Sequence, residues 1–202
     1  FDAFRSKQLE AIQTALNGDD CMVIMPTGGG KSICYQLPPL ITGGCTVVIS
    51  PLISLMQDQV ASLEQLGIAA AYLNSAMDSE AQYSVITKMR GGELRLLYLA
   101  PERLLRPGTL KMLKHSAITL IAIDEAHCVS QWGHDFRHDY LELDQLSKDF
   151  PGVPRMALTA TADERTRADI AARLRLSDPQ YFIGGFDRPN IRYAVQPRAN
   201  AR

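Results

Sequence analysis

The sequence predicts an α/β fold in which helices cover both faces of a parallel β-sheet. Short, continuous apolar runs, such as residues 21–25 and 118–123, alternate along the chain with segments of helical periodicity. These runs lack the polar alternation of a half-exposed strand, so both faces of each strand are expected to be buried. A length of 202 residues with 46% apolar and 21% charged content is typical of one globular domain.

The expected strands share a continuous apolar run bounded by glycine, proline or polar residues. They cover residues 21–25, 46–50, 69–73, 94–100, 118–123, 155–159 and 181–183. The expected helices share apolar residues at helical spacing and end at polar residues or glycine. They cover residues 4–16, 33–37, 52–66, 79–89, 140–150 and 163–174. Ligands of such sheets bind at the carboxyl ends of the strands.

The glycine-rich segment 25–32 (MPTGGGKS) lies between the first expected strand and a helix start. Glycines let backbone N–H groups face an anion, Lys31 would bind the β and γ phosphates, and Ser32 would bind magnesium. The strict phosphate-loop pattern is not met, because Met25 stands at its first glycine position. An ordinary surface turn is the alternative. The nucleotide-binding candidates are Pro26, Thr27, Gly28, Gly29, Gly30, Lys31 and Ser32.

Two adjacent carboxylates, Asp124 and Glu125, follow the buried run 118–123. Adjacent acids repel one another and lose hydration there unless a cation or a proton-transfer role compensates. Asp124 would hold magnesium, and Glu125 would deprotonate the water that attacks a γ phosphate. We group Lys31 and His127 with them as catalytic candidates. A solvated acidic loop is the alternative.

Charge and cysteine content limit the possible partners. The chain has 21 basic and 22 acidic residues, so nucleic acid would have to bind in a local groove. Four cysteines in mostly apolar segments suit reduced thiols. His127, Cys128, His134 and His138 lie close in sequence, but their spacing is wrong for common zinc sites, so zinc is not expected. No run is long enough for a membrane span. A start at Phe1 without methionine suggests a piece of a longer protein.

The order of the motifs resembles a known family. The phosphate loop, residues 124–127 (DEAH) and residues 159–161 (TAT) are similar to motifs I, II and III of superfamily 2 helicases. Residues 128–137 (CVSQWGHDFR) resemble the aromatic-rich loop of RecQ DNA helicases. Residues 186–191 (FDRPNI) resemble the segment that leads to the second motor lobe of that family.

This resemblance implies that residues 1–185 form the first RecA-like lobe, with a P-loop NTPase fold, and that residues 186–202 begin the connection to a second lobe. It implies ATP and Mg²⁺ as cofactors, and single-stranded and duplex DNA as partners. It also implies 3′–5′ translocation and duplex unwinding in DNA recombination and repair. The family's second lobe supplies arginines to the ATP site, so the chain alone is expected to hydrolyse ATP poorly. The expected location is the cytoplasm or nucleoid in a bacterium and the nucleus in a eukaryote.

The resemblance also gives roles to residues at the two ends of the site. Residues 4–8 (FRSKQ) are similar to the family's motif 0, so Gln8 would bond the adenine edge and Arg5 would stack on the base. Ser50 lies in a segment similar to motif Ia, and Arg103 follows the fourth strand. Both would grip the DNA backbone without reading its sequence. An ordinary helix start and plain loops are the alternatives.

The aromatic loop is expected to couple DNA binding to ATP hydrolysis. Trp132, the only tryptophan, lies among polar residues and suits stacking on unpaired bases. Burial of Trp132 against a helix is the alternative. His138 and Asp139 stand where the family commonly has Pro-Glu. The candidates for DNA binding and coupling are Ser50, Arg103, Gln131, Trp132, Phe136, Arg137, Thr159 and Thr161.

Two other classes of protein remain as rival hypotheses. A different P-loop enzyme, such as a small-molecule kinase or a transporter ATPase, would not respond to DNA and leaves residues 128–137 unexplained. A non-catalytic module with the same fold would be expected to have lost at least one of Lys31, Ser32, Asp124 and Glu125, all of which are present.

Overall fold

Seven strands form a single sheet in the order β3-β4-β2-β5-β6-β1-β7 in the computed structural model, which describes residues 3–5, 7–133 and 135–185. The paired strands are parallel, as predicted. The strands are β1 (Cys21–Ile24), β2 (Cys45–Ile49), β3 (Ala70–Leu73), β4 (Leu96–Leu99), β5 (Ile118–Ile123), β6 (Arg155–Thr159) and β7 (Gln180–Ile183).

Helices follow almost every strand. The α-helices are α1 (Gln8–Leu16), α2 (Lys31–Gln36), α3 (Pro38–Thr42), α4 (Ile53–Gln65), α5 (Ser79–Arg90), α6 (Pro101–Leu104), α7 (Pro107–Lys114), α8 (Leu146–Asp149) and α9 (Glu164–Arg173). Two 3₁₀ helices, η1 (Ala126–Val129) and η2 (His138–Gln145), lie between β5 and α8. Among the described residues, no helix is both long and apolar enough to cross a bilayer.

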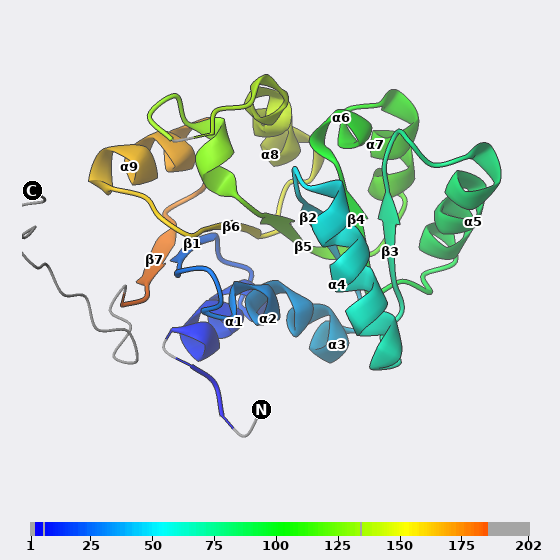
Figure 1. Ribbon diagram of the computed structural model, residues 1–202, viewed down its shortest axis with the longest axis horizontal. Helices are drawn as coiled ribbons and strands as arrows, with labels where there is room; N and C mark the ends of the chain where they lie inside the picture. Colours follow the sequence, from blue (N-terminus) through cyan, green and yellow to red (C-terminus); the bar gives the residue numbers. More distant parts are fainter. Residues whose placement is uncertain (1–2, 6, 134, 186–202) are drawn as a thin grey trace, which may run out of the picture.

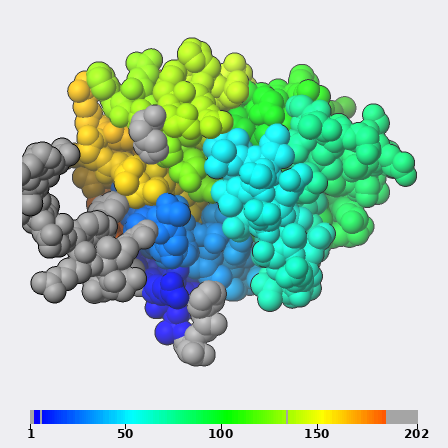
Figure 2. All heavy atoms as spheres, in the orientation of Figure 1, coloured from blue at the N-terminus to red at the C-terminus, as the bar shows by residue number. Residues whose placement is uncertain are grey.

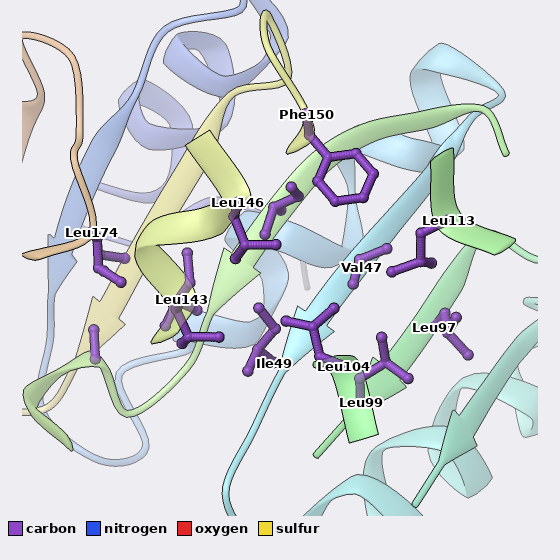
Figure 3. Close-up of a cluster of buried hydrophobic side chains, with 14 of the residues drawn as sticks. Val47, Ile49, Leu97, Leu99, Leu104, Leu113, Leu143, Leu146, Phe150 and Leu174 are labelled. Carbon is purple, nitrogen blue, oxygen red and sulfur yellow. The ribbon is translucent and has the colours of Figure 1, made fainter. Parts of the chain in front are cut away.

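Two buried apolar clusters lie on the two faces of the sheet. Helices α1 to α3 lie on one side of the sheet, and α6 to α9 lie on the other (Figure 1). The cluster on the second side joins Leu143, Leu146 and Phe150 to strand residues such as Val47 and Ile49 (Figure 3). Because both faces of the sheet are covered, strands β1 and β2 are buried along their whole length, which explains the largely apolar runs in the sequence.

The parallel register brings the three motifs to one edge of the sheet. Ile24 pairs with Thr159, and the Met25 N–H donates to the Thr159 carbonyl at 3.1 Å. The Asp124 N–H donates to the Ile49 carbonyl at 2.9 Å. On the surface, the blue segment that holds the phosphate loop borders the yellow segment after β6 (Figure 2). Segments distant in sequence therefore meet where β1, β5 and β6 end.

Prolines account for the helices that the sequence analysis missed. Helices α3, α6 and α7 each have a proline at a first helical position, Pro38, Pro101 and Pro107. The sequence analysis treats Pro101 as the end of the fourth strand, but proline is tolerated in the first turn of a helix, where its missing N–H has no helical partner.

The helix expected over residues 140–150 is instead η2 followed by the single turn of α8. Tyr140, Leu143 and Leu146 are all buried, and they are three residues apart. A 3₁₀ helix places residues at this spacing on one line, so it directs all three side chains into the core. The prediction of one regular α-helix here was wrong for that reason.

Asp20 joins three segments at the opposite edge of the sheet. Its carboxylate accepts hydrogen bonds from the Arg155 N–H at 2.7 Å, the Arg155 guanidinium at 2.6 Å and the Ser177 N–H at 2.7 Å. Both partners of the ion pair are nearly buried. Removal of one partner would leave a buried charge without its counter-ion.

We therefore expect Asp20→Ala to lower the free energy of unfolding by roughly 3 kcal/mol. Glu10→Ala is the control, because it removes the exposed pair between Lys7 and Glu10, and exposed pairs contribute little to stability. Urea denaturation of both variants measures the difference. An equal loss in the two variants would show that Asp20 does not hold the segments together.

Candidate active site

The phosphate loop forms a tight turn between β1 and α2, as the sequence predicts. Gly28 and Gly30 have φ angles of +80° and +81°, which favour glycine. A Cβ atom at Gly29 would lie 2.8 Å from the Pro26 carbonyl oxygen, so a side chain does not fit there. The Lys31 ammonium donates to the Met25 carbonyl at 2.9 Å, which holds the lysine across the loop. The result is a backbone cradle with one cation.

Gln8 connects the N-terminal segment to this cradle. Its side-chain amide donates to the Gly30 carbonyl at 3.0 Å and approaches the Gly29 carbonyl at 3.4 Å. Its amide oxygen accepts from the Arg5 N–H at 2.7 Å. The Gln8 side chain is buried, and its contacts are with protein backbone. Its role in recognising adenine stays a prediction.

A cavity of about 530 Å³ opens beside Gln8 and the start of α2. Its lining includes Phe4, Arg5, Ser32 and Ile33, so it offers apolar surface together with a cation and a hydroxyl. Small-molecule pockets commonly have this size and composition. The cavity therefore has room for a nucleobase next to the phosphate loop, on the side where the sequence analysis placed the base.

Asp124 is the buried carboxylate of the site, with 8% of its surface exposed. Its carboxylate accepts from the Glu125 N–H at 3.0 Å, and its carbonyl accepts from the Tyr140 hydroxyl at 3.0 Å. Burial, together with the charge of Glu125, raises the pKa of Asp124 to about 6, although the Glu125 N–H and Lys31 act in the opposite direction. The ionised form of Asp124 is disfavoured while no cation is bound, and a divalent cation beside it would favour that form. The carboxylate therefore fits a site for a divalent cation.

Glu125 lies in a backbone conformation that is rare for its residue type. Its φ angle is +48°. Such conformations cost free energy and persist where the surrounding structure imposes them, often in functional sites. The turn separates the Glu125 side chain from that of Asp124 and places its carboxylate 3.3 Å from the His127 Nδ1.

His127 links the acidic motif to residues 159–161. Its Nδ1 lies 3.0 Å from the Thr159 hydroxyl, and that hydroxyl donates to the Thr161 carbonyl at 3.2 Å. Because the Thr159 hydroxyl donates its only proton to Thr161, it must accept the hydrogen bond from His127. The Nδ1 of His127 therefore carries a proton and donates to Thr159. The fold thus brings Glu125, His127 and Thr159 together. Thr161 takes part through its carbonyl, whereas the sequence analysis singled out the residue without distinguishing backbone from side chain.

Trp132 is 55% exposed, so its burial against a helix, the alternative left open by the sequence, is wrong. The other candidates in the loop have partners of their own. The rings of Phe136 and His138 contact each other edge-to-face, with their centroids 5.1 Å apart, and the Arg137 guanidinium donates to Asp135 at 2.9 Å. Gln131 is exposed. Their roles in DNA binding stay predictions.

Ser50 and Arg103 lie deeper than residues that grip a DNA backbone from the surface. Both are buried, Arg103 with 9% of its surface exposed. Burial lowers the pKa of Arg103, and the nearby Arg106 lowers it further. Among the described residues, the Ser50 hydroxyl and the Arg103 Nε have no hydrogen-bond partner. The expectation that they hold DNA stays a prediction, and it requires a ligand or a movement that reaches them.

One group of side chains has spacing compatible with a metal ion. Ligand atoms of His127, Cys128 and Asp135 lie within 4.8 Å of one another. However, the carboxylate of Asp135 is paired with Arg137. Burial, together with the charge of Asp135, raises the pKa of Cys128 to about 12, so the thiolate that zinc requires is disfavoured. Of the zinc candidates named from the sequence, His134 lies outside the described residues.

Sequence analysis missed three residues that support the site. Tyr140 holds the backbone of Asp124, and Ser130 donates to Asp169 of α9 at 2.7 Å. Nothing in their sequence spacing identifies Ser130 or Asp169. The apolar spacing of Tyr140 with Leu143 could have identified Tyr140 as a core residue, but not its contact with Asp124.

A cradle ending in Lys-Ser beside a buried aspartate and an adjacent, partly exposed glutamate defines a site of the nucleotide-hydrolase class. The family model described as DEAD/DEAH box helicase matches residues 5–170. The chain belongs to this family.

Similar proteins narrow the relationship. ATP-dependent DNA helicase RecQ of Haemophilus influenzae is 50% identical over 198 residues, which cover 98% of this chain and 32% of that protein. RecQ-like DNA helicase BLM of Xenopus laevis is 45% identical over 98% of this chain and 15% of its own length. A hypothetical ATP-dependent RNA helicase structure from Sulfolobus tokodaii shares the fold, with a TM-score of 0.65 and 22% identity over 90% of this chain and 53% of its own. This chain therefore spans about a third of the Haemophilus relative.

The raised pKa of Asp124 predicts that ionisation of this group lowers the free energy of unfolding when no divalent cation is bound. Between the two pKa values the folded state holds a proton that the unfolded state releases, so this loss of stability is absent below about pH 4 and complete above about pH 6. We expect Asp124→Asn to stabilise the fold by about 1 to 3 kcal/mol at pH 7.5 and to have little effect at pH 4. Urea denaturation in EDTA at both pH values measures this. A stabilisation that is the same at both would contradict the assignment.

Proposed function

We propose that this chain is the first motor lobe of an ATP-dependent DNA helicase of the RecQ type, formed by residues 1–185. Residues 186–202, which lie outside the described part of the chain, would begin the connection to a second lobe. In the complete protein, the lobe would drive 3′–5′ translocation on single-stranded DNA and duplex unwinding, in DNA recombination and repair. The observation that carries the proposal is the meeting of Lys31, Asp124, Glu125 and His127 beside the aromatic loop.

The residues present fit ATP with Mg²⁺. The backbone cradle and Lys31 would hold the phosphates, and Ser32 and Asp124 would hold the cation. A bound cation would neutralise charge on the phosphates during hydrolysis. Glu125 would accept the proton of the attacking water, and His127 would hold Thr159 in place. Arg5 and Gln8, at the wall of the cavity, would position the base.

DNA would bind at the same edge of the sheet. Exposed Trp132 offers a surface on which any base can stack, and stacking of this kind does not depend on sequence. The nearly balanced charge of the chain means that local contacts supply the attraction. Because the loop begins within η1, which carries His127, a change at Trp132 has a short path to the hydrolytic residues.

The test measures the ATPase rate of the full-length protein that contains this chain, with and without oligo-dT. Single-stranded DNA is expected to raise the rate of the wild type. Glu125→Gln removes the general base, so the rate should fall about 100-fold or more. Trp132→Ala removes the stacking surface, so the ratio of the rates with and without DNA should fall towards one.

Tyr83→Ala is the matched control, because it removes an aromatic residue of α5 that is 71% exposed and lies outside the site. It should respond to DNA as the wild type does. A wild-type protein that hydrolyses ATP without any response to DNA would leave the nucleotide site intact but would overturn the helicase assignment. A small-molecule P-loop enzyme would then be the better hypothesis.

A further inference from the structure

Helix α9 anchors the base of the aromatic loop, residues 128–137. One oxygen of the Asp169 carboxylate accepts from the Ser130 hydroxyl at 2.7 Å, and its other oxygen accepts from Arg173 at 2.7 Å. The Ser130 hydroxyl oxygen in turn accepts from the Trp132 N–H at 3.2 Å. The backbone on the N-terminal side of Trp132 is therefore fixed to the helix that follows residues 159–161.

The same helix also contacts the Trp132 ring. The guanidinium carbon of Arg165 lies 3.3 Å from the centroid of this ring. Arg165 and Asp169 are four residues apart, so they lie on one face of α9. A planar guanidinium stacks on an indole face by cation–π attraction and close contact. One helix face thus holds both the backbone and the ring.

We propose that Arg165 is a positioning residue, which supports one face of Trp132 and leaves the other face to an unpaired base. The inference rests on the proposed function and extends it to a residue outside the helicase motifs. Trp132 remains 55% exposed although Arg165 covers one face, so surface is left for a stacking partner. An arginine, an indole and a base would then form one stack, with the base on the outside.

The advantage of such support is entropic. An exposed aromatic side chain on a loop samples several rotamers, and a ligand that stacks on it must restrict them. The contact with Arg165 restricts the ring before DNA arrives. Arg165 also brings positive charge near the phosphates of the bound strand. The first effect acts only through Trp132, whereas the second does not need the ring, so the two effects can be separated by experiment.

The first test measures the fluorescence of the 202-residue chain, in which Trp132 is the single tryptophan. In DNA-free Arg165→Ala, we expect the emission of Trp132 to change and its quenching by acrylamide to increase, since the supported face becomes accessible. Arg167→Ala is the matched control, because it removes the same charge from the same helix two residues away. Its emission and quenching should equal those of the wild type.

The second test is a double-mutant cycle on DNA affinity, measured in the full-length protein by the anisotropy of dye-labelled oligo-dT. Arg165→Ala should raise the dissociation constant about fivefold. Arg165→Lys should fall between it and the wild type, because lysine keeps the charge but lacks the planar group. In the Trp132→Ala background, Arg165→Ala should have no further effect.

An equal loss of affinity in the presence and absence of Trp132 would overturn the inference and would make Arg165 a phosphate contact only. Unchanged quenching in Arg165→Ala would also overturn it. If the fluorescence of wild-type Trp132 responds to oligo-dT but Arg165→Ala behaves as the wild type, the inference fails and the proposed function stands. If wild-type Trp132 does not respond and DNA does not stimulate ATP hydrolysis, both fail.

Discussion

The parallel register of β1, β5 and β6 is the constraint on which the site depends. The hydrogen bond from Met25 to Thr159 aligns the phosphate loop with residues 159–161, and the one from Asp124 to Ile49 aligns the acidic pair with the end of β2. A shift of one residue in any of these strands would turn its side chains to the opposite face. It would also move the attached loop away from its neighbours. The continuous apolar strands that fix this register thus also fix the chemistry.

The electrostatics of the site follow from where that register places the acids. Asp124 is buried at the end of a central strand, which disfavours its ionised form, and Lys31 compensates only in part. The positive φ of Glu125 turns the second carboxylate towards His127. A single backbone conformation thus gives two adjacent acids different surroundings, and surroundings of this kind allow different roles.

Much of this arrangement could be predicted from the sequence, because its signals are local. Apolar runs show buried parallel strands, and the segments MPTGGGKS, DEAH and TAT lie where those strands end. What could not be predicted depends on contacts between distant segments. The burial of Arg103, the stacking of Arg165 on Trp132 and the bond from Tyr140 to Asp124 arise only from tertiary packing. Helices α3, α6 and α7, which begin at prolines, were not predicted, because proline occurs both at the ends of strands and at the starts of helices.

Close packing around η1 connects the aromatic loop to the candidate hydrolytic residues Glu125 and His127. A Cβ atom at Gly133 would overlap the His127 carbonyl oxygen, so the residue next to Trp132 lies directly against the backbone of this histidine. The Arg137 N–H donates to the Cys128 carbonyl at 2.9 Å, which closes the loop on the same turn. Gly133 and Arg137 thus both lie against the backbone of η1. Two contact paths lead away from Trp132, one through Ser130 and Asp169 to α9 and the other through the turn that carries His127 and contacts Thr159. Both of these paths reach residues 159–161, one through the helix that follows them and the other through the Thr159 hydroxyl.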